Sequence, residues 1–427
     1  MRFQDRIHEH SIGSGKLYTL QTGIEDVVSW RGVIVANPVF DRGDEMLMHL
    51  LVALLDKGTK RRDRFAIADV LENRGAQLGF NVSGLRIGFW GRALKGDVST
   101  VLGVMAEQLR EPLFDADEFE KARQRLTASV RRGMESTGHQ ASSQILRRLY
   151  PPAHPNYSLS SEEELDQLRR VQREEVIAFY ERHVGANELL MVMVGDLDEG
   201  QALNAAREGL ESWEGRPTPA GYAAEAHPTT GGARLVHAMP DRMNLDVRIG
   251  HALRLRRDSP DYAPLYLANH ILGGNFSSRL MDIVRDDMGL TYGIHSTIAG
   301  ISSRYDGHWN ISVTLSQENL ERGIAATLAE VTRFVDEGPT ARELEENITT
   351  ITGSYKVKLA TTGGLADAIL GGLKIGAGTG HLDAWPERIA SLTEAETRAA
   401  IARYFAPDHF DVAIAGTLPD RSVIPPE

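Results

Sequence analysis

The feature that most constrains the fold is a pattern that occurs twice along the 427 residues of the chain. Each half contains a helical stretch that leads directly into an apolar, strand-like segment. Ile177 in the first copy aligns with Ile401 in the second at an offset of 224 (401 − 177). The stretch from Ala116 aligns with the stretch from Ala341 at an offset of 225 (341 − 116), each after a proline-containing turn. Two independent matches at nearly one offset predict one fold used twice.

The domain organisation follows from this repeat. Residues Glu214–Arg234 are rich in proline, glycine, alanine and threonine without apolar periodicity, which is typical of a linker. We therefore predict an N-terminal domain over 1–213 and a C-terminal domain over 235–427. Each half shows strands with alternating apolar residues, followed by helices of 3.6-residue period, which predicts an α+β class with an antiparallel-rich sheet covered by helices. Two such halves are expected to face each other around a chamber.

Composition excludes several classes of function. The net charge of −12 and the absence of a basic tract argue against a nucleic-acid partner. With no cysteine, the chain has no disulfide, thiolate nucleophile or thiolate metal site. The polar N-terminus is unlike a signal peptide, and no apolar run reaches the length of a membrane span. We expect a cytoplasmic protein without a membrane partner, although a processed periplasmic form would have the same sequence features.

The most informative segment runs from residue 273 to residue 295. A glycine pair precedes a predicted helix that carries Arg285, Gly289 ends this helix, and Tyr292 lies at the start of a strand. A cation and a phenol seven positions apart (292 − 285), on either side of a glycine break, can project toward one point and suit a carbonyl that becomes an oxyanion. A structural alternative exists, because an Arg is favoured near a helix C-terminus and a Tyr is common in strands.

This segment resembles one known family. The glycine pair, Ser277-Ser278-Arg279-Leu280 and Gly289-Leu290 before Tyr292 resemble the Arg/Tyr signature of the pitrilysin–insulinase–mitochondrial processing peptidase family. The resemblance covers essentially the whole chain and implies the processing-peptidase-like metallohydrolase fold. Family members that cleave peptides carry an inverted zinc motif, H-x-x-E-H, on a helix. Its two histidines bind Zn²⁺ with a glutamate from a later helix, and its own glutamate activates the water.

The zinc motif is degenerate here. Lys57-Gly58-Thr59, which often follows the motif in this family, places it at residues 49–53. His49 is present, but Val52 and Ala53 stand where the catalytic glutamate and the second histidine are expected. The third ligand position falls at about Ser129, in a stretch without glutamate. A lone imidazole cannot hold catalytic zinc, so we predict no metal site and no cofactor in this chain.

Two histidine patterns have structural interpretations that we favour. His49 is expected to be a buried, hydrogen-bonded histidine on the core face of its helix. His8 and His10 are two apart and share one face of a predicted strand, so they could bind a metal. An adventitious surface pair near the terminus is the favoured interpretation.

The resemblance also implies roles for individual residues. Gly273, Gly274 and Asn275 would approach a bound peptide, Arg285 would bind a substrate carbonyl, and Tyr292 would donate to the oxyanion. In bacterial relatives, a chain that has the Arg/Tyr pair but lacks the zinc motif assembles with a homologous chain that carries the motif. The implied protein is therefore the non-zinc-binding subunit of a heterodimeric zinc endopeptidase, inactive alone, with zinc only in its partner and peptide as substrate. Homodimerisation of the isolated chain is possible.

Two other functions stay open at the level of sequence. One is a catalytically silent, structural subunit like the core proteins of the respiratory chain that share this fold. The other is a homodimer that binds peptides without cutting them. Retention of both Arg285 and Tyr292 speaks against a purely structural role, because a scaffold has no need of an oxyanion donor.

Overall fold

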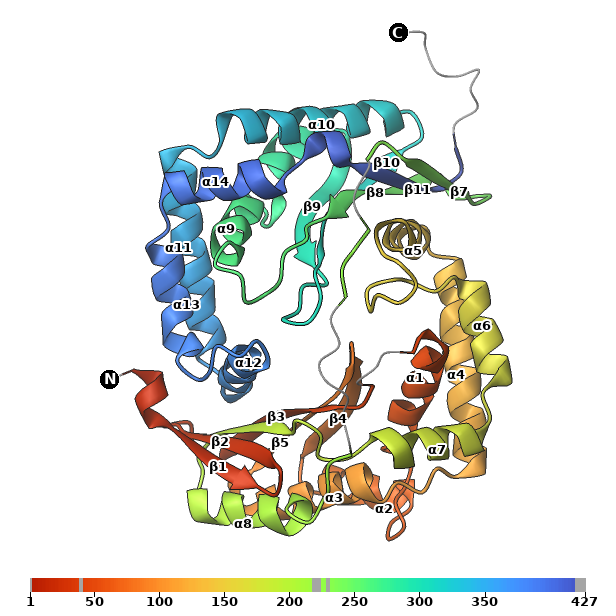
Figure 1. Cartoon of the computed structure of the whole chain (residues 1–427), viewed down its shortest axis with the longest axis vertical. Helices are drawn as coiled ribbons and strands as arrows, with labels where there is room; N and C mark the ends of the chain where they lie inside the picture. The colour runs from red at the N-terminus through yellow and green to blue at the C-terminus, as the bar shows by residue number, and fades with distance from the viewer. Residues whose placement is uncertain (1, 38–40, 217–223, 228–230, 419–427) are drawn as a thin grey trace. The chain divides into compact units, whose positions relative to one another are not determined.

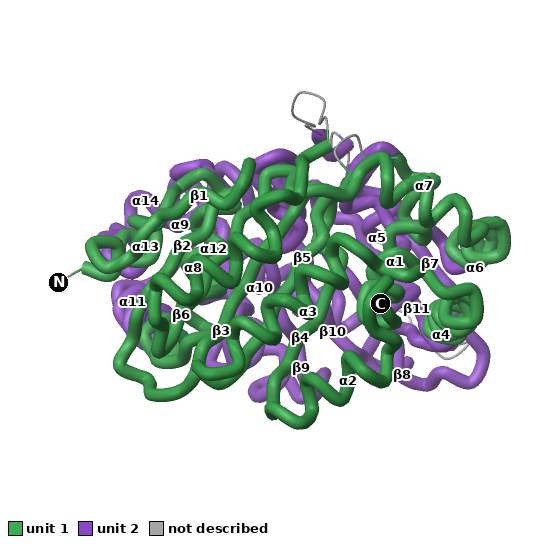
Figure 2. Tube along the Cα trace, turned by 90° about the horizontal axis from the view of Figure 1, so that it is seen from below, with its two compact units in different colours: residues 1–130, 162–222, 354–385 green, residues 131–161, 223–353, 386–427 purple. Residues whose placement is uncertain are grey.

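The computed structural model describes residues 2–37, 41–216, 224–227 and 231–418. Parts of the predicted linker, residues 217–223 and 228–230, lie outside the described residues. The chain forms two compact units, which Figure 2 distinguishes by colour. Unit 1 contains residues 1–130, 162–222 and 354–385, and unit 2 contains residues 131–161, 223–353 and 386–427. Each unit therefore contains three separate segments of the chain, whereas each predicted domain was one continuous segment.

Unit 1 is built on a six-stranded sheet with the order β1-β2-β6-β3-β5-β4. Only the β2·β6 pair is parallel, and the other four pairs are antiparallel. The strands are β1 (Ile7–Ile12), β2 (Gly15–Gln21), β3 (Val27–Val35), β4 (Gln77–Ser83), β5 (Arg86–Leu94) and β6 (Leu190–Gly195).

Both faces of this sheet bury apolar side chains, and neighbouring residues along a strand point to opposite faces. Leu17 and Met191 pack with helices α1 (Glu45–Leu54), α3 (Val98–Arg110) and α8 (Glu199–Leu210). Tyr18 and Val192 pack on the other face with residues of α12 (Thr362–Lys374). Because both faces are covered, the central strand β6 reads as a continuous apolar run in the sequence.

Unit 2 contains a five-stranded sheet with the order β7-β11-β8-β10-β9. Its β7·β11 pair is parallel and its remaining pairs are antiparallel. The strands are β7 (Arg234–Ala238), β8 (Asn244–Ala252), β9 (Thr291–Ala299), β10 (His308–Ser316) and β11 (Asp411–Gly416). Strand β9 is at one edge of this sheet.

The two sheets confirm the predicted duplication. Apart from the additional edge strand β1, replacing β2, β6, β3, β5 and β4 by β7, β11, β8, β10 and β9 converts one order into the other, with every parallel or antiparallel pair preserved. Equivalent elements begin 225 residues apart for α4 and α11 (341 − 116). For β6 and β11 the offset is 221 (411 − 190), and it is also 221 for α7 and α14 (394 − 173). The predicted alignment of Ile177 with Ile401 was therefore three residues, nearly one helical turn, out of register.

The two copies exchange one helix each. Helix α5 (Thr137–Leu149) follows the first copy in sequence but packs on β8 and β11 of unit 2, and α12 packs on β3 and β6 of unit 1 (Figure 1). The helices are equivalent, since they begin 225 residues apart (362 − 137). Their polar contacts are also equivalent: Arg31 of β3 donates to Asp367 at 2.8 Å, and Arg248 of β8 donates to Ser142 at 3.0 Å.

The remaining helices cover the sheets and connect their strands. In chain order they are η1 (Phe3–Arg6), η2 (Arg42–Asp44), α2 (Arg64–Glu72), η3 (Lys95–Asp97), α4 (Ala116–Met134), α6 (Ser161–Arg170), α7 (Arg173–His183), α9 (Tyr262–Gly273), η4 (Met281–Asp287), α10 (Leu320–Glu337), α11 (Ala341–Lys358), α13 (His381–Ala390), α14 (Glu394–Tyr404) and η5 (Pro407–His409). Among the described residues, no helix combines the length and apolar character needed to cross a membrane.

Candidate functional site

The candidate site lies in unit 2, on the segment that leads from α9 through η4 into β9. It begins with a glycine pair whose small size is required by internal packing. Gly273 is buried, and a Cβ there would lie 2.6 Å from the Cβ of Ser296 on β9. A Cβ on Gly274 would lie 2.7 Å from the Cα of His270. Both glycines therefore let the end of α9 approach neighbouring backbone closely. The predicted contact of these glycines with a peptide stays a prediction.

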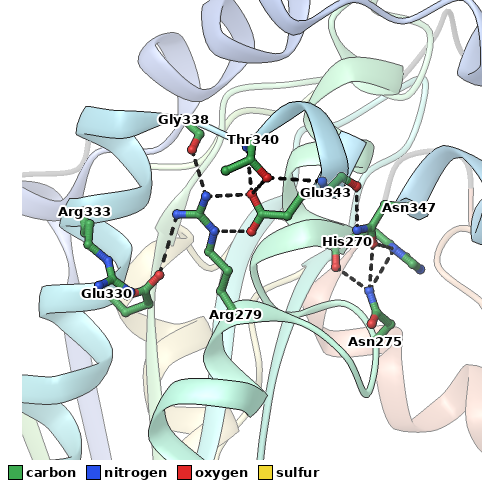
Figure 3. Close-up of polar contacts among 9 residues, drawn as sticks. All are labelled: His270, Asn275, Arg279, Glu330, Arg333, Gly338, Thr340, Glu343 and Asn347. Carbon is green, nitrogen blue, oxygen red and sulfur yellow. Dashed lines mark hydrogen bonds and ion pairs between the residues drawn. The ribbon is translucent and has the colours of Figure 1, made fainter. Parts of the chain in front are cut away.

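Asn275 fixes the chain as it leaves α9 (Figure 3). Its amide Nδ2 donates to the carbonyl of His270 at 2.8 Å and to Oδ1 of Asn347 on α11 at 2.9 Å. Its Oδ1 accepts from the backbone N–H of Ser277 at 2.8 Å. Burial lowers the pKa of His270, which favours a neutral ring beside these amides. Asn275 thus has an internal anchoring role, and a contact with substrate stays a prediction.

Arg279 forms a second anchor four residues later (Figure 3). Its guanidinium makes a two-pronged contact with Glu343, with 2.7 Å between Nη2 and Oε2, and donates to the carbonyl of Gly338 at 3.0 Å. It also stacks over Phe334, 4.9 Å from the ring centroid. Burial opposes ionisation of Glu343, but hydrogen bonds from Arg279 and Thr340 outweigh it and lower the pKa of that carboxyl. The network ties the segment to α10 and α11.

Arg285 lies on η4, a seven-residue π-helix. π-Helical turns are rare and frequently mark functional sites. As predicted, Gly289 ends this helix with a left-handed φ of +61°, and its N–H donates to the carbonyl of Arg285 at 3.0 Å. The guanidinium donates from Nη1 to Asp286 at 2.9 Å and lies over the ring of Phe276, with 4.7 Å between Cζ and the ring centroid.

Tyr292 lies at an irregularity in strand β9. Thr291 pairs with Leu315 and Ile294 pairs with Val313, so two residues of β9 oppose one residue of β10. Strict alternation would direct Tyr292 to the same face as Ile294, which is 3% exposed. The extra residue of this β-bulge re-aims the side chain, and Tyr292 is fully exposed at 102%.

Local hydrogen bonds maintain the bulge. The hydroxyl of Thr291 donates to the carbonyl of Thr314 at 2.6 Å and accepts from the N–H of Gly293 at 3.2 Å. The phenol of Tyr292 makes no hydrogen bond with any residue that the structure describes. A donor of this kind, on an edge strand and without an internal partner, is available to a ligand.

The degenerate zinc-motif positions lie in unit 1. His49, Val52 and Ala53 are half-buried on α1, and the last two pack against the hydrophobic core. Burial lowers the pKa of His49, whose ring has no hydrogen bond among the described residues. The prediction of a buried, hydrogen-bonded histidine was therefore wrong: His49 is half-buried, and the residues at the two neighbouring motif positions are apolar.

Ser129 is exposed on α4. Residues 49, 52, 53 and 129 together supply one imidazole, two aliphatic side chains and one hydroxyl, which do not fit zinc. Across the ranges that the structure describes, no group of three or more histidine, aspartate or glutamate side chains is arranged to hold a metal ion. His8 and His10 both contact Glu199 of α8, each at 2.8 Å, so the sequence pattern missed their acidic partner.

Sequence reasoning also missed Phe276. An aromatic residue two positions after a glycine pair carries no signal of its own, and its contact with Arg285 depends on how η4 is oriented. Phe276 is a large apolar side chain, yet it is 71% exposed.

Two adjacent parts of the chain match descriptions of one peptidase family. Residues 47–158 match the insulinase (peptidase family M16) description, and residues 170–351 match the peptidase M16 inactive domain. The chain is 22% identical over 327 residues to the non-peptidase homolog YmxG of Helicobacter pylori, covering 75% of this chain and 73% of that protein. It is 21% identical to an uncharacterized zinc protease of Streptomyces coelicolor, covering 97% and 92% of the two chains.

The chain is also similar to a processing-peptidase subunit and to a solved structure. The chain is 21% identical to the mitochondrial-processing peptidase subunit beta of Lentinula edodes, over 75% of this chain and 70% of that protein. The crystal structure of a peptidase M16 inactive domain from Pseudomonas fluorescens superposes with a TM-score of 0.87 at 22% identity, covering 97% and 98% of the chains. At this identity, the structural similarity establishes the fold alone.

Proposed function

Because this chain belongs to the insulinase (peptidase M16) family, we propose that it is the non-zinc-binding subunit of a two-chain zinc endopeptidase. The observation that carries the proposal is the bulge that turns Tyr292 out of the sheet and leaves its side chain 102% exposed. A tyrosine with only a structural role would follow the alternation of its strand and pack. The similarity to a chain named as a subunit of a processing peptidase supports an assembly of two chains.

The chemistry assigned to this chain is substrate binding and charge stabilisation. The guanidinium of Arg285 has five N–H donors, and only Nη1 is engaged by Asp286 among the described residues. The remaining donors can bind a backbone carbonyl of a peptide by charge-assisted hydrogen bonds. The phenol of Tyr292 can donate to the oxygen of the attacked carbonyl as it gains negative charge. Zinc and the general base would come from a homologous partner chain, since the donors of unit 1 do not fit a metal.

The first experiment measures zinc in the isolated, full-length chain. We expect no stoichiometric zinc by elemental mass spectrometry and no cleavage of an internally quenched peptide library. One equivalent of zinc, removed by a chelator together with hydrolysis of that library, would overturn the proposal.

The second experiment tests Tyr292 in the complex with a homologous chain that carries the intact H-x-x-E-H motif. Tyr292→Phe removes one oxyanion donor and should lower kcat by roughly 10²–10³-fold while assembly measured by gel filtration is unchanged. Tyr355→Phe is the matched control, because it removes a hydroxyl that donates to the carbonyl of Leu382 at 3.3 Å in unit 1. A Tyr292→Phe complex with wild-type turnover would instead indicate a structural subunit.

A further inference from the structure

The ring of Phe276 supports the guanidinium of Arg285. The Cζ of Arg285 lies 4.7 Å from the centroid of this ring, within the range of a cation–π contact. Phe276 is 71% exposed, whereas the Arg285 side chain is 30% exposed. Most of the ring therefore lies in solvent, and the guanidinium is its polar contact.

The backbone that carries this ring is held on both sides. Asn275, directly before it, bonds to His270 and Asn347, and Arg279, three residues after it, contacts Glu343 (Figure 3). The intervening Ser278 is 1% exposed. An exposed aromatic ring thus stands on a loop that is fixed by two separate polar anchors. Such a ring is pre-organised, because the positions of its neighbours restrict where its Cβ can lie.

The geometry of the contact preserves the hydrogen-bonding capacity of Arg285. Stacking uses the face of the guanidinium, whereas its N–H donors point outward in the plane of the group. An ion pair such as that with Asp286 uses a donor, but the ring uses none. A free arginine side chain samples many rotamers, and ordering it on binding lowers affinity. The ring restricts these rotamers before substrate arrives.

We propose that Phe276 is a positioning residue that holds the guanidinium of Arg285 ready to bind a peptide carbonyl. This inference rests on the proposed function of Arg285 as a substrate ligand. Because that contact is made to the bound peptide before reaction, loss of the ring should act on KM rather than on kcat. Tyr292, which acts on developing charge, should act on kcat.

The test compares Phe276→Leu with Phe276→Trp in the active complex, using one internally quenched peptide. Phe276→Leu keeps an apolar side chain without an aromatic face, and should raise KM about two- to fivefold with kcat unchanged. Phe276→Trp keeps the face and should restore the wild-type KM. In an Arg285→Gln background, Phe276→Leu should have no further effect.

A matched control exists in unit 1. Phe65 is also exposed, at 64%, and Arg64 stacks on it with Cζ 4.5 Å from the centroid. Phe65→Leu removes the same kind of contact away from Arg285 and Tyr292 in sequence and unit, so it should leave KM unchanged. An equal rise in KM for Phe65→Leu would show a general effect of exposed rings and contradict the proposal.

A second readout needs no partner. Phenylglyoxal modifies arginine side chains, and peptide mapping of the isolated full-length chain reports the rate at Arg285 with Arg64 as internal standard. The rate at Arg285 should rise in Phe276→Leu but not in Phe276→Trp. An unchanged rate overturns the positioning role by itself. If Arg285→Gln leaves KM and kcat of the complex unchanged, Arg285 is not a substrate ligand and the proposed function fails. If Arg285→Gln raises KM but Phe276→Leu does not, only the positioning role of Phe276 fails.

Discussion

Helices α1 and α9 occupy equivalent places in the two copies of the fold, but equivalent positions carry mostly aliphatic side chains in α1 and hydrogen-bonded polar side chains in α9. Both the helices and the strands that precede them are 217 residues apart (262 − 45 and 244 − 27). His49, Val52 and Ala53 of α1 therefore correspond to Tyr266, Asn269 and His270 of α9. In α1 two of these three positions are aliphatic and pack against the core. In α9 the last two are hydrogen-bonded to other elements.

The partners in unit 2 show what these contacts achieve. Asn269 donates to the carbonyl of Ser296 on β9 at 3.1 Å, and His270 contacts Asn347 on α11 at 2.7 Å. Asn269 joins the helix before the Arg/Tyr segment to the strand after it, and His270 joins that helix to α11. A repeated fold therefore preserves the positions of helices without preserving the chemistry of their side chains. The aliphatic positions in α1 pack against the hydrophobic core, whereas the polar positions in α9 hold the backbone that carries exposed polar groups.

The pKa directions show the same contrast. Burial raises the pKa of Glu164 on α6 in unit 1 to about 7, and the nearby charge of Glu45 on α1 adds to this shift. Glu343 in unit 2 is also penalised by burial, yet its contacts with Arg279 and Thr340 lower its pKa. Ion pairing and hydrogen bonds thus outweigh the cost of burying Glu343, whereas burial dominates at Glu164.

The largest effect is expected from breaking the compensated network. Arg279→Met leaves Glu343, and the 2%-exposed side chain of Glu330, without this guanidinium. The free energy of unfolding, measured by urea titration, should fall by about 3–5 kcal/mol. His49→Leu in α1 is the matched change in unit 1 and should stay within about 1 kcal/mol of the wild type, because it removes no recorded hydrogen bond.

A double variant sharpens this result. Adding Glu343→Gln to Arg279→Met removes the carboxylate that has lost its guanidinium partner, so the double variant should be more stable than the sum of the single losses. Two results would contradict this expectation: strictly additive changes in the free energy of unfolding, or a loss for Arg279→Met no larger than that for His49→Leu. Either would show that the ion pairs of Arg279 contribute no more to stability than the side chain of His49.

A smaller effect, of opposite sign, is expected from Glu164. Its folded-state pKa of about 7 lies above its ordinary value of 4.5, so the folded state binds more protons than the unfolded state between these pH values. Stability is then lost as pH rises through this window. Glu164→Gln mimics the protonated group, and should raise the free energy of unfolding by on the order of 2 kcal/mol at pH 8 and little at pH 5.

The control for Glu164 is its exposed neighbour. Glu162→Gln changes charge in the same first turn of α6 and should show no gain at pH 8. If Glu164→Gln stabilises equally at pH 5 and pH 8, the cause is not the titration of Glu164.

Much of the fold could be predicted because it rests on local patterns. Alternation and 3.6-residue periodicity predicted sheets covered by helices, the repeat predicted two copies, and Gly289 predicted the end of the helix that carries Arg285. The exchange of α5 and α12 could not be predicted. A repeat in sequence does not say which copy of a sheet a helix will cover, since equivalent strands offer equivalent surfaces.

The site depended on contacts that no local pattern encodes. The partners of Asn275 and Arg279 on α11 are 72 and 64 residues away. Strict alternation along β9 would direct Tyr292 to the buried face, and only the pairing with β10 reveals the bulge that exposes it. Residue types and spacing therefore identified the candidates, whereas long-range pairing determined which of them are available to a ligand.

The smallest effect is expected from restoring the zinc motif in unit 1. Val52→Glu with Ala53→His recreates H-x-x-E-H on α1, but the third ligand position, Ser129, is exposed on α4 and carries only a hydroxyl. Catalytic zinc requires three protein ligands, so the isolated double variant should retain less than one equivalent of zinc after dialysis and hydrolyse no peptide. One equivalent of zinc together with peptide hydrolysis would mean that unit 1 lacks only these two side chains of an otherwise intact zinc site. Adding Ser129→Glu supplies a third ligand and distinguishes two explanations for a double variant without zinc. Zinc uptake only in the triple variant would show that α4 still has the geometry of the zinc site. No uptake by the triple variant would show that packing around Val52 and Ala53 has changed this geometry.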